Sequence, residues 1–454
     1  MKNTKRLHQQ LASASIPPLI CKFAVPNTVG LLAITVYSLA DSYFVSALGT
    51  EASAAVGVTF ALHVLIQAVG YTLGMGAGSL LSRALGQKKD RDAREFCLVA
   101  ILLSFFFGVL ITVFGLRFQE SLLHLLGATE ATLPPARAYV APLLWSAAPM
   151  CATFTLSQLL RSEGKAVYSM IGLCLGSLLN ISLDPLLISV LGWGIRGASS
   201  ATLISQWGAC LFLLFSYLRR PMELSPFHAV RIAAFAKAGR ILFTGLPSLF
   251  RQGLSGTAAI LLNHAAASVS ETALTAVTLV SRVFLLVFSF CLGLAQGMVP
   301  VVGYNYGAGD LQRVKKAYSF SLFSSSLVML LFSIPLFAFS PQIFSLFYKD
   351  AEVIKIGTDV LRAQAVVLFT HGLVTPTIFY LQTVGLPLLA TILAVARQGL
   401  FFLPLILTLP ARFGLWGVEW SQPLADAATF LFAIPFLLFC FRSIKKMTKQ
   451  KREA

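Results

Sequence analysis

Two aspartates in apolar surroundings are the residues of this sequence most suited to chemistry. Asp41 lies in the run TVYSLADSYFV, and Asp184 lies in LLNISLDPLLI, a stretch without a basic residue. An aspartate at the centre of a membrane helix costs about 2.5–3.5 kcal/mol on insertion scales, so such residues are functional candidates by default. Residues four apart are neighbours on a helix, which places Tyr37 on the face of Asp41 and Asn180 on the face of Asp184.

These side chains suit the binding of a proton or of a hard cation. A carboxylic acid in a low-dielectric environment keeps its proton near neutral pH and releases it when water returns. A set of oxygen atoms equally suits Na⁺, and the candidate ligands are Asp41, Asn180, Asp184 and Thr202, with Ser205 nearby. The residues leave both ions open. A purely structural role is the weaker interpretation for two acids with an asparagine in phase.

The composition indicates the elements that position these residues. The chain has 454 residues, of which 57% are hydrophobic and only 12% charged, and its mean hydropathy is +0.79. Apolar runs of about 20 residues, enough to cross a bilayer core, recur from end to end. We therefore predict an all-α polytopic membrane protein with twelve spans, at roughly 19–45, 52–82, 95–118, 137–160, 166–191, 195–218, 240–267, 273–303, 317–340, 357–382, 387–411 and 415–442.

The positive charges predict the orientation of these spans. Of 35 basic residues, 24 fall in the tails and the loops of one side, and only seven fall in the opposite loops. The positive-inside rule then places both termini in the cytoplasm. This distribution explains the net charge of +17 without nucleic acid as a partner.

The sequence also repeats itself. Adding 221 to first-half positions carries Pro26 to Pro247, Gly76 to Gly297 and Gly164 to Gly385, and the offset becomes 220 at Gly194 and Gly414. Each half holds six spans, so the halves enter the membrane in the same sense, as in transporters built from parallel repeats. We predict an N-lobe at residues 1–220, a basic cytoplasmic linker at 221–240 and a C-lobe at 241–454, around a central cleft.

The second half lacks both acids, since the same offset carries Asp41 to Leu262 and Asp184 to Leu405. An ion site is therefore expected in the first lobe alone. The second half instead carries intramembrane cations, for which a structural ion-pair network is the favoured interpretation; these residues and their candidate partners are Arg251, Arg282, Arg397, Glu419 and Asp426. Histidines 63, 264 and 371 are predicted to be hydrogen-bonded packing residues.

Other chemistries find little support. The seven cysteines have no disulfide or metal-site spacing, and no Walker A pattern or catalytic triad is present. We expect a protein that is not an enzyme and has no cofactor beyond a coupling ion, H⁺ or Na⁺.

With these residues in view, the chain resembles the multidrug and toxic compound extrusion (MATE) family from about Ile16 to Lys446. The resemblance rests on Pro26 and on the stretches LADSYFVSALGTEASAAVGV, GMGAGSLLSRALGQ, NISLDPLLI, GWGIRGASSATLISQ, GLPSLFRQGLSG and QGMVPVVGYNYGAGD. The chain is most similar to the branch of the DNA-damage-inducible protein F (DinF-like).

This resemblance implies a fold, a function and site residues. It implies twelve helices in two six-helix lobes and export of organic cations in exchange for H⁺ or Na⁺. The residues that match the family's cation-site pattern are Asp41, Asn180, Asp184 and Thr202; Pro26 marks where the first helix bends as the site changes protonation, and Tyr37 and Tyr139 are candidate cavity residues. Another branch uses acids in helices 7 and 10, and these spans contain no acid here.

The first functional hypothesis is thus a cation-coupled multidrug antiporter in the bacterial inner (plasma) membrane, monomeric and surrounded by lipid. The alternative is a flippase for lipid-linked precursors, which a cleft rich in arginine would favour. A membrane-embedded enzyme acting on lipid is the third hypothesis, and the sequence has no visible catalytic cluster for it.

Overall fold

The computed structural model describes residues 9–130, 132–218 and 236–453. Helices make up almost all of these residues, and no strand occurs among them. The first half contains α2 (Ile16–Ser46), α3 (Thr50–Gly86), α4 (Asp90–Arg117), α5 (Gln119–Leu125), α6 (Leu133–Trp145), α7 (Ala147–Ser162), α8 (Ala166–Pro185), the π-helix η1 (Leu186–Val190) and α9 (Gly194–Leu218).

The second half repeats this order of elements. It contains α10 (Ala238–Val269), α11 (Glu271–Ala308), α12 (Leu311–Ala338), α13 (Ser340–Phe347), α14 (Ala351–Val367), the 3₁₀-helix η4 (Leu368–Thr370), α15 (His371–Val384), α16 (Pro387–Val395), the π-helix η5 (Ala396–Phe402), α17 (Leu403–Phe413) and α18 (Leu415–Glu453). Short helices α5 and α13, which the sequence analysis did not predict, begin 221 residues apart. The internal repeat is therefore confirmed down to its minor elements.

Ten helical segments among the described residues are long and apolar enough to cross a membrane. The bent pair α6 and α7, which meet at 49°, gives an eleventh. Helix α10 has 32 residues and contains the polar residues Arg251, Gln252 and Asn263, and its length of about 48 Å is sufficient to span a membrane. Together they give the twelve predicted spans, and the fold class is confirmed.

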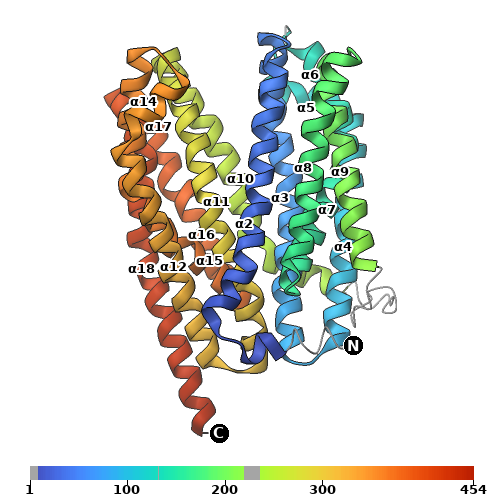
Figure 1. Ribbon diagram of the computed structural model, residues 1–454, viewed down its shortest axis with the longest axis vertical. Coiled ribbons are helices and arrows are strands. Elements are labelled where there is room, and N and C mark those ends of the chain that lie inside the picture. The colour runs from blue at the N-terminus through green and yellow to red at the C-terminus, as the bar shows by residue number, and fades with distance from the viewer. Residues whose placement is uncertain (1–8, 131, 219–235, 454) are drawn as a thin grey trace.

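Two bundles lie side by side (Figure 1). Helices α2 to α9 form one bundle, here called the N-lobe, and α10 to α18 form the other, the C-lobe. Helices α2 and α3 of the N-lobe pack against α10 and α11 of the C-lobe along the seam between them. The predicted linker at 221–240 falls mainly on residues 219–235, which lie outside the described residues.

Capping residues mark where several helices begin or end. Ser270 caps α11 by accepting the backbone N–H of Ala273 at 3.0 Å, and Asp310 caps α12 in the same way from Arg313. Both side chains satisfy donors that the first helical turn leaves without partners. Gly309, at φ 75°, ends α11 in the left-handed conformation that favours glycine.

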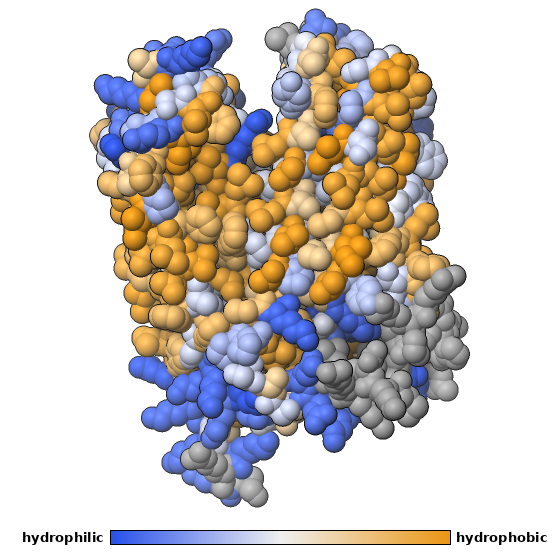
Figure 2. All heavy atoms as spheres, in the orientation of Figure 1, coloured by the Kyte–Doolittle hydropathy of each residue, from blue (hydrophilic) through white to orange (hydrophobic). Residues whose placement is uncertain are grey.

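The two ends of the molecule differ. Figure 2 shows a gap between the lobes at its upper end, whereas hydrophilic residues gather at the lower end, where α18 finishes. Near that lower end, small residues permit close contact across the seam. A Cβ atom on Gly86 of α3 would overlap the carbonyl oxygen of Tyr304 on α11, and one on Gly307 would overlap that of Arg83. The lobes are thus closed at the basic end and separated at the other.

Candidate functional site

The N-lobe brings together the two aspartates singled out by sequence. Asp41 is half-buried on α2, and Asp184 is fully buried (0% exposed) near the end of α8, which packs against α2. The two carboxylates are close enough to interact electrostatically. Within the described part of the chain, Oδ1 of Asp41 and both carboxylate oxygens of Asp184 have no hydrogen-bond partner. These acids are therefore available to bind a proton or an ion.

Asn180 and Thr202 add oxygen atoms beside Asp184. The side-chain amide of Asn180 donates to Oγ1 of Thr202 at 3.4 Å, which joins α8 to α9. This leaves Oδ1 of Asn180 without a partner among the described residues. Thr202 and Asn180 are both buried. The unpartnered oxygens of Asp41, Asn180 and Asp184 suit a hard cation such as Na⁺, whereas the hydroxyl of Thr202 already bonds Asn180 and the carbonyl of Ala198.

The composition of this set excludes softer metals. Nowhere in the described ranges do three or more His, Cys, Asp or Glu side chains group as they would around a metal ion. Transition metals favour sulfur and imidazole ligands. A proton or an alkali cation is therefore the ligand that fits two carboxylates, an amide and a hydroxyl.

Tyr37 and Tyr139, the candidate cavity residues, come from the same lobe as the acids, and their role stays a prediction. Tyr37 comes from α2 and Tyr139 from α6, and both are buried. Each interacts electrostatically with Asp41 and with Asp184. Tyr37 also lines a small cavity together with Asn180.

The helices around the site depart from regular α geometry. α8 passes into a π-helix, η1, directly after Asp184 and Pro185. Proline removes a backbone donor and frees a carbonyl one turn back, and π-turns are frequent at functional sites. Pro26 is buried inside α2, which continues through it from Ile16 to Ser46 as one helix. The role of Pro26 as a bending point stays a prediction.

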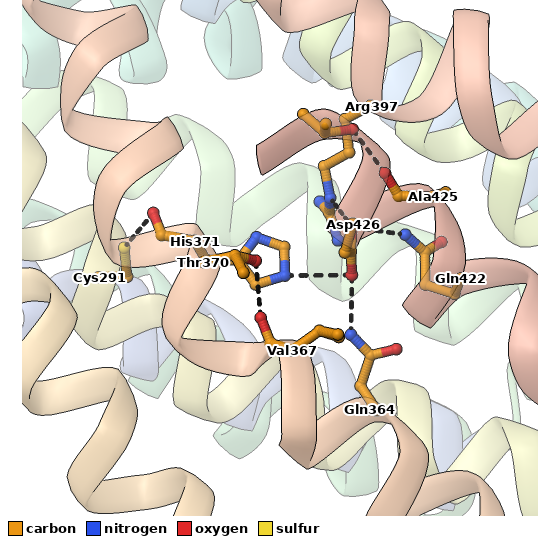
Figure 3. A network of polar contacts seen from close by, with 10 residues as sticks. Cys291, Gln364, Val367, Thr370, His371, Arg397, Gln422, Ala425 and Asp426 are labelled. Atoms are coloured by element: carbon orange, nitrogen blue, oxygen red, sulfur yellow. Dashed lines mark hydrogen bonds and ion pairs between the residues drawn. The ribbon is translucent and has the colours of Figure 1, made fainter. Parts of the chain in front are cut away.

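The C-lobe contains a different polar cluster, centred on Asp426 (Figure 3). Arg397 of η5 donates from Nε to Asp426 at 2.8 Å, and Nε2 of His371 lies 3.2 Å from the same carboxylate. The amide groups of Gln364 and Gln422 donate to it at 2.9 and 3.0 Å. Asp426 therefore has a complete set of partners, and the predicted ion-pair network is confirmed for Arg397 and Asp426.

The other charged residues of the second half lie outside this network. Arg251 donates to Gln252 at 3.3 Å and lies 5.7 Å from the ring centre of Phe379. Arg282 is exposed, and neither arginine forms an ion pair in the described ranges. Glu419 is half-buried and interacts with Asp359. The prediction of one network for all these residues is thus wrong for Arg251, Arg282 and Glu419.

The histidines are only partly as predicted. His371 is buried and hydrogen-bonded, and His63 pairs with Gln67 at 2.8 Å, so the packing interpretation is confirmed for both. His264 is exposed, and the packing interpretation is wrong for it. Neither Gln364 nor Gln422 was predicted. The i,i+4 spacing of Gln422 and Asp426 was a usable signal, whereas nothing in the local sequence of Gln364 indicates its contact with Asp426, 62 residues away.

Comparisons with known proteins agree with the fold and with the repeat. The MatE family model matches residues 26–186 and again 247–408, so each match begins at one of the repeated prolines, Pro26 and Pro247. The chain is 27% identical over 442 residues to the multidrug export protein MepA of Staphylococcus saprophyticus, covering 95% of each chain.

Solved structures resemble the whole molecule. A crystal structure of MATE in the straight conformation has a TM-score of 0.88 and 27% identity, covering 97% of this chain and 98% of that chain. A crystal structure of MATE in the bent conformation has a TM-score of 0.85 and 27% identity, covering 99% of both. Similarity over this length extends to both lobes and to the seam between them.

Proposed function

Because the chain belongs to the MATE family of membrane transporters, which are not enzymes, we propose that it is a secondary active multidrug exporter. In this proposal it exports lipophilic organic cations in exchange for H⁺ or Na⁺. The observation that carries the proposal is a pair of intramembrane carboxylates, the half-buried Asp41 and the fully buried Asp184. Oδ1 of Asp41 and both carboxylate oxygens of Asp184 lack protein partners among the described residues. The MepA relative is described as a multidrug export protein, which supports the same substrate class.

The coupling ion binds at the acids of the N-lobe. A proton neutralises one carboxylate, or Na⁺ takes oxygens from Asp41, Asn180, Asp184 and Thr202. Either ion removes the free-energy cost of leaving buried negative charge without a partner. An organic cation also neutralises this negative charge, so the coupling ion and the drug compete for the same carboxylates. This competition exchanges one for the other.

Transport requires that the site open to each side in turn. In this structure the lobes are closed at the basic end by contacts such as Gly86 with α11, and are separated at the other end. We assign the basic end and both termini to the cytoplasm of a bacterial inner membrane, with residues 1–220, 221–240 and 241–454 as N-lobe, linker and C-lobe. Related proteins have been solved in straight and bent conformations, and we assign the bend in this chain to Pro26. We take the transporter to act as a monomer.

A flippase for lipid-linked precursors is the second candidate, and one observation favours it. Arg251 is a half-buried cation within a span and has no ion pair among the described residues. Such a cation suits the phosphate of a lipid headgroup. Arg251 already bonds Gln252, whereas Asp41 and Asp184 have oxygens without partners among the described residues, so the exporter is the better-supported function.

The test uses purified protein in lipid vesicles. With an imposed pH gradient or an imposed Na⁺ gradient, the parent moves an ethidium-like dye, and the gradient that drives it identifies the ion. Asp41→Asn and Asp184→Asn reduce transport to the rate of protein-free vesicles, because an amide cannot take up a proton or balance a cation. Asp359→Asn, the same change at an exposed acid, leaves transport unchanged.

Two results contradict the proposal. Transport by folded Asp41→Asn and Asp184→Asn variants at the parent rate removes the acids from the mechanism. Movement of a lipid-linked sugar across the bilayer without any gradient, in vesicles that do not move the dye, indicates the flippase instead.

A further inference from the structure

Lys237, immediately before α10, joins the leading end of the C-lobe to the N-lobe. Its ammonium group lies 2.6 Å from Oδ1 of Asp92 and 2.6 Å from Oε2 of Glu95, and both acids belong to the first two turns of α4. The side chains of Lys237 and Glu95 are only 15% and 10% exposed, so water screens this contact less than it screens a typical surface ion pair. We call this bridge between the lobes the lysine contact.

Arg313, near the start of α12, joins the leading end of the N-lobe to the C-lobe. Its guanidinium donates to the backbone carbonyls of Leu11 at 3.2 Å and of Ala14 at 2.7 Å, shortly before α2. Asn305 of α11 also donates to the carbonyl of Leu11, at 3.0 Å, and accepts a hydrogen bond from Nε of Arg313 at 3.2 Å. Leu11 is buried. We call this second bridge between the lobes the arginine contact.

The internal repeat relates the two contacts. Helices α4 and α12 begin 221 residues apart, and the same offset carries Asp92 to Arg313. It also carries Ile16, the first residue of α2, to Lys237. Each lobe therefore uses the same place in the repeat to hold the residues that lead into the other lobe. The groups differ, because the N-lobe uses two carboxylates and the C-lobe uses a guanidinium and an amide.

Both contacts lie at the closed, basic end of the molecule. Helix α4 begins four residues after Gly86, and α12 begins four residues after Gly307. These are the two glycines whose close approach joins α3 to α11 across the seam. When transporter lobes rotate to open one end, the ion pairs and hydrogen bonds across that end are rearranged. Opening of the basic end therefore acts on the lysine contact and on the arginine contact.

From these observations we propose that the lysine contact and the arginine contact form a double latch, which holds the basic end closed and releases each time that end opens. Each contact consists of a few polar interactions, so it shifts a population between two conformations and does not lock one of them. The inference rests on the alternating access of the proposed exporter. It assigns conformational roles to Asp92, Glu95, Lys237 and Arg313, which lie outside the ion site.

The first test measures the separation of the lobes at the basic end. Spin labels are attached to Gln87→Cys of the N-lobe and to Lys446→Cys of the C-lobe, both exposed positions. Every protein compared also carries Cys21→Ser, because Cys21 is exposed. Double electron–electron resonance on the full chain in lipid vesicles gives the fraction of molecules with the longer distance between labels, here called the open fraction. This measurement needs neither a substrate nor an ion gradient.

The variants change one contact at a time. Lys237→Glu places a negative charge beside the two acids, and Arg313→Gln removes the guanidinium. Lys237→Glu combined with Asp92→Lys and Glu95→Lys restores the lysine contact with its charges exchanged. The matched control is Arg91→Gln, which removes a different ion pair of Glu95, at 3.1 Å, that lies within α4 and does not connect the lobes.

We expect the open fraction to rise about fivefold in Lys237→Glu and in Arg313→Gln, the effect of losing one well-formed charged contact. The charge-exchanged triple variant should return to within about twofold of the parent, and Arg91→Gln should equal the parent. A second measurement uses Lys237→Cys with Asp92→Cys, joined by a short bifunctional thiol reagent that a reductant cleaves. The joined protein should lose gradient-driven dye efflux and regain it on reduction, because the latch releases in every cycle.

An open fraction no higher than that of Arg91→Gln, in either single variant, overturns the double latch. A triple variant as open as Lys237→Glu does so as well, since the change then reflects local disturbance and not the lost contact. Undiminished efflux by the joined protein shows that the lysine contact is a permanent hinge. Failure of the proposed function has a different signature: Asp41→Asn and Asp184→Asn would then transport dye at the parent rate, while the open fractions would still follow the latch.

Discussion

The two lobes share one architecture but treat a buried carboxylate in opposite ways. Asp426 of the C-lobe accepts hydrogen bonds or ion pairs from Arg397, His371, Gln364 and Gln422. Asp184 of the N-lobe is equally buried, and neither of its oxygens has a partner in the described ranges. A fully partnered acid has no capacity left for a ligand, whereas an unpartnered acid needs one.

This difference shows that the repeat preserved the scaffold and not the chemistry. α2 to α9 and α10 to α18 follow the same order, including the π-helices η1 and η5. Within that frame the acids differ in position, since the offset of 221 carries Asp41 to Leu262 and Asp184 to Leu405. The C-lobe cluster joins α14, α15, η5 and α18 through Asp426.

Asp426→Leu tests the comparison between the two buried carboxylates, and it is expected to lower the free energy of unfolding more than any other substitution considered below. Removing the acid leaves the Arg397 guanidinium, 15% exposed, without its charge partner. Breaking one side of a buried ion pair typically costs about 3–5 kcal/mol. Thermal unfolding in detergent, followed by tryptophan fluorescence, should show a large loss of stability.

The double variant Arg397→Met with Asp426→Leu is the control. Replacing both charges by apolar groups of similar size is often neutral, so most of the lost stability should return. A double variant as unstable as Asp426→Leu alone would mean that the pair does not act as one unit, and that the C-lobe acid is not the structural counterpart described above.

The fold was largely predictable from the sequence, because long apolar runs and a constant offset depend on local pattern. The break within the fourth predicted span, 137–160, was not anticipated. There α6 ends at Trp145 and α7 begins at Ala147 with a bend of 49°. Pro142 and Pro149 flank this break and were its signal.

The acids of the N-lobe were also visible in the sequence, since a carboxylate in an apolar run stands out. The position of Asn180 beside Asp184 follows from helical spacing. Gln422, four residues before Asp426 on α18, follows from the same spacing, whereas Gln364 was not predictable because it reaches Asp426 from α14 through tertiary packing. The small cavity between α2, α7, α8 and α9 was not predictable for a related reason, because it depends on the distances between four helices.

A smaller loss of stability is expected from substitution of Arg251. Unlike Arg397, this C-lobe cation has no acidic partner among the described residues. Arg251 lies over Phe379 and binds Gln252, without an acid among the described residues. Arg251→Gln should lower the free energy of unfolding by about 1 kcal/mol, the size of one cation–π contact. Arg251→Lys, which keeps the charge over the ring, should lower it less. A loss as large as that of Asp426→Leu would reveal an acidic partner and place Arg251 in the structural network.

The smallest effect on stability is expected from Asp184→Asn, a substitution that should abolish transport. Asp184→Asn removes no hydrogen bond, because neither carboxylate oxygen has a partner in the described part of the chain. Its free energy of unfolding should therefore differ from that of the parent by less than about 1 kcal/mol, a typical value for one net hydrogen bond. Thermal unfolding of Asp184→Asn and Asp426→Asn, in the same detergent and without Na⁺, measures the contrast directly. Equal destabilisation by the two substitutions would mean that Asp184 also has a structural partner, and the functional asymmetry between the lobes would lose its physical basis.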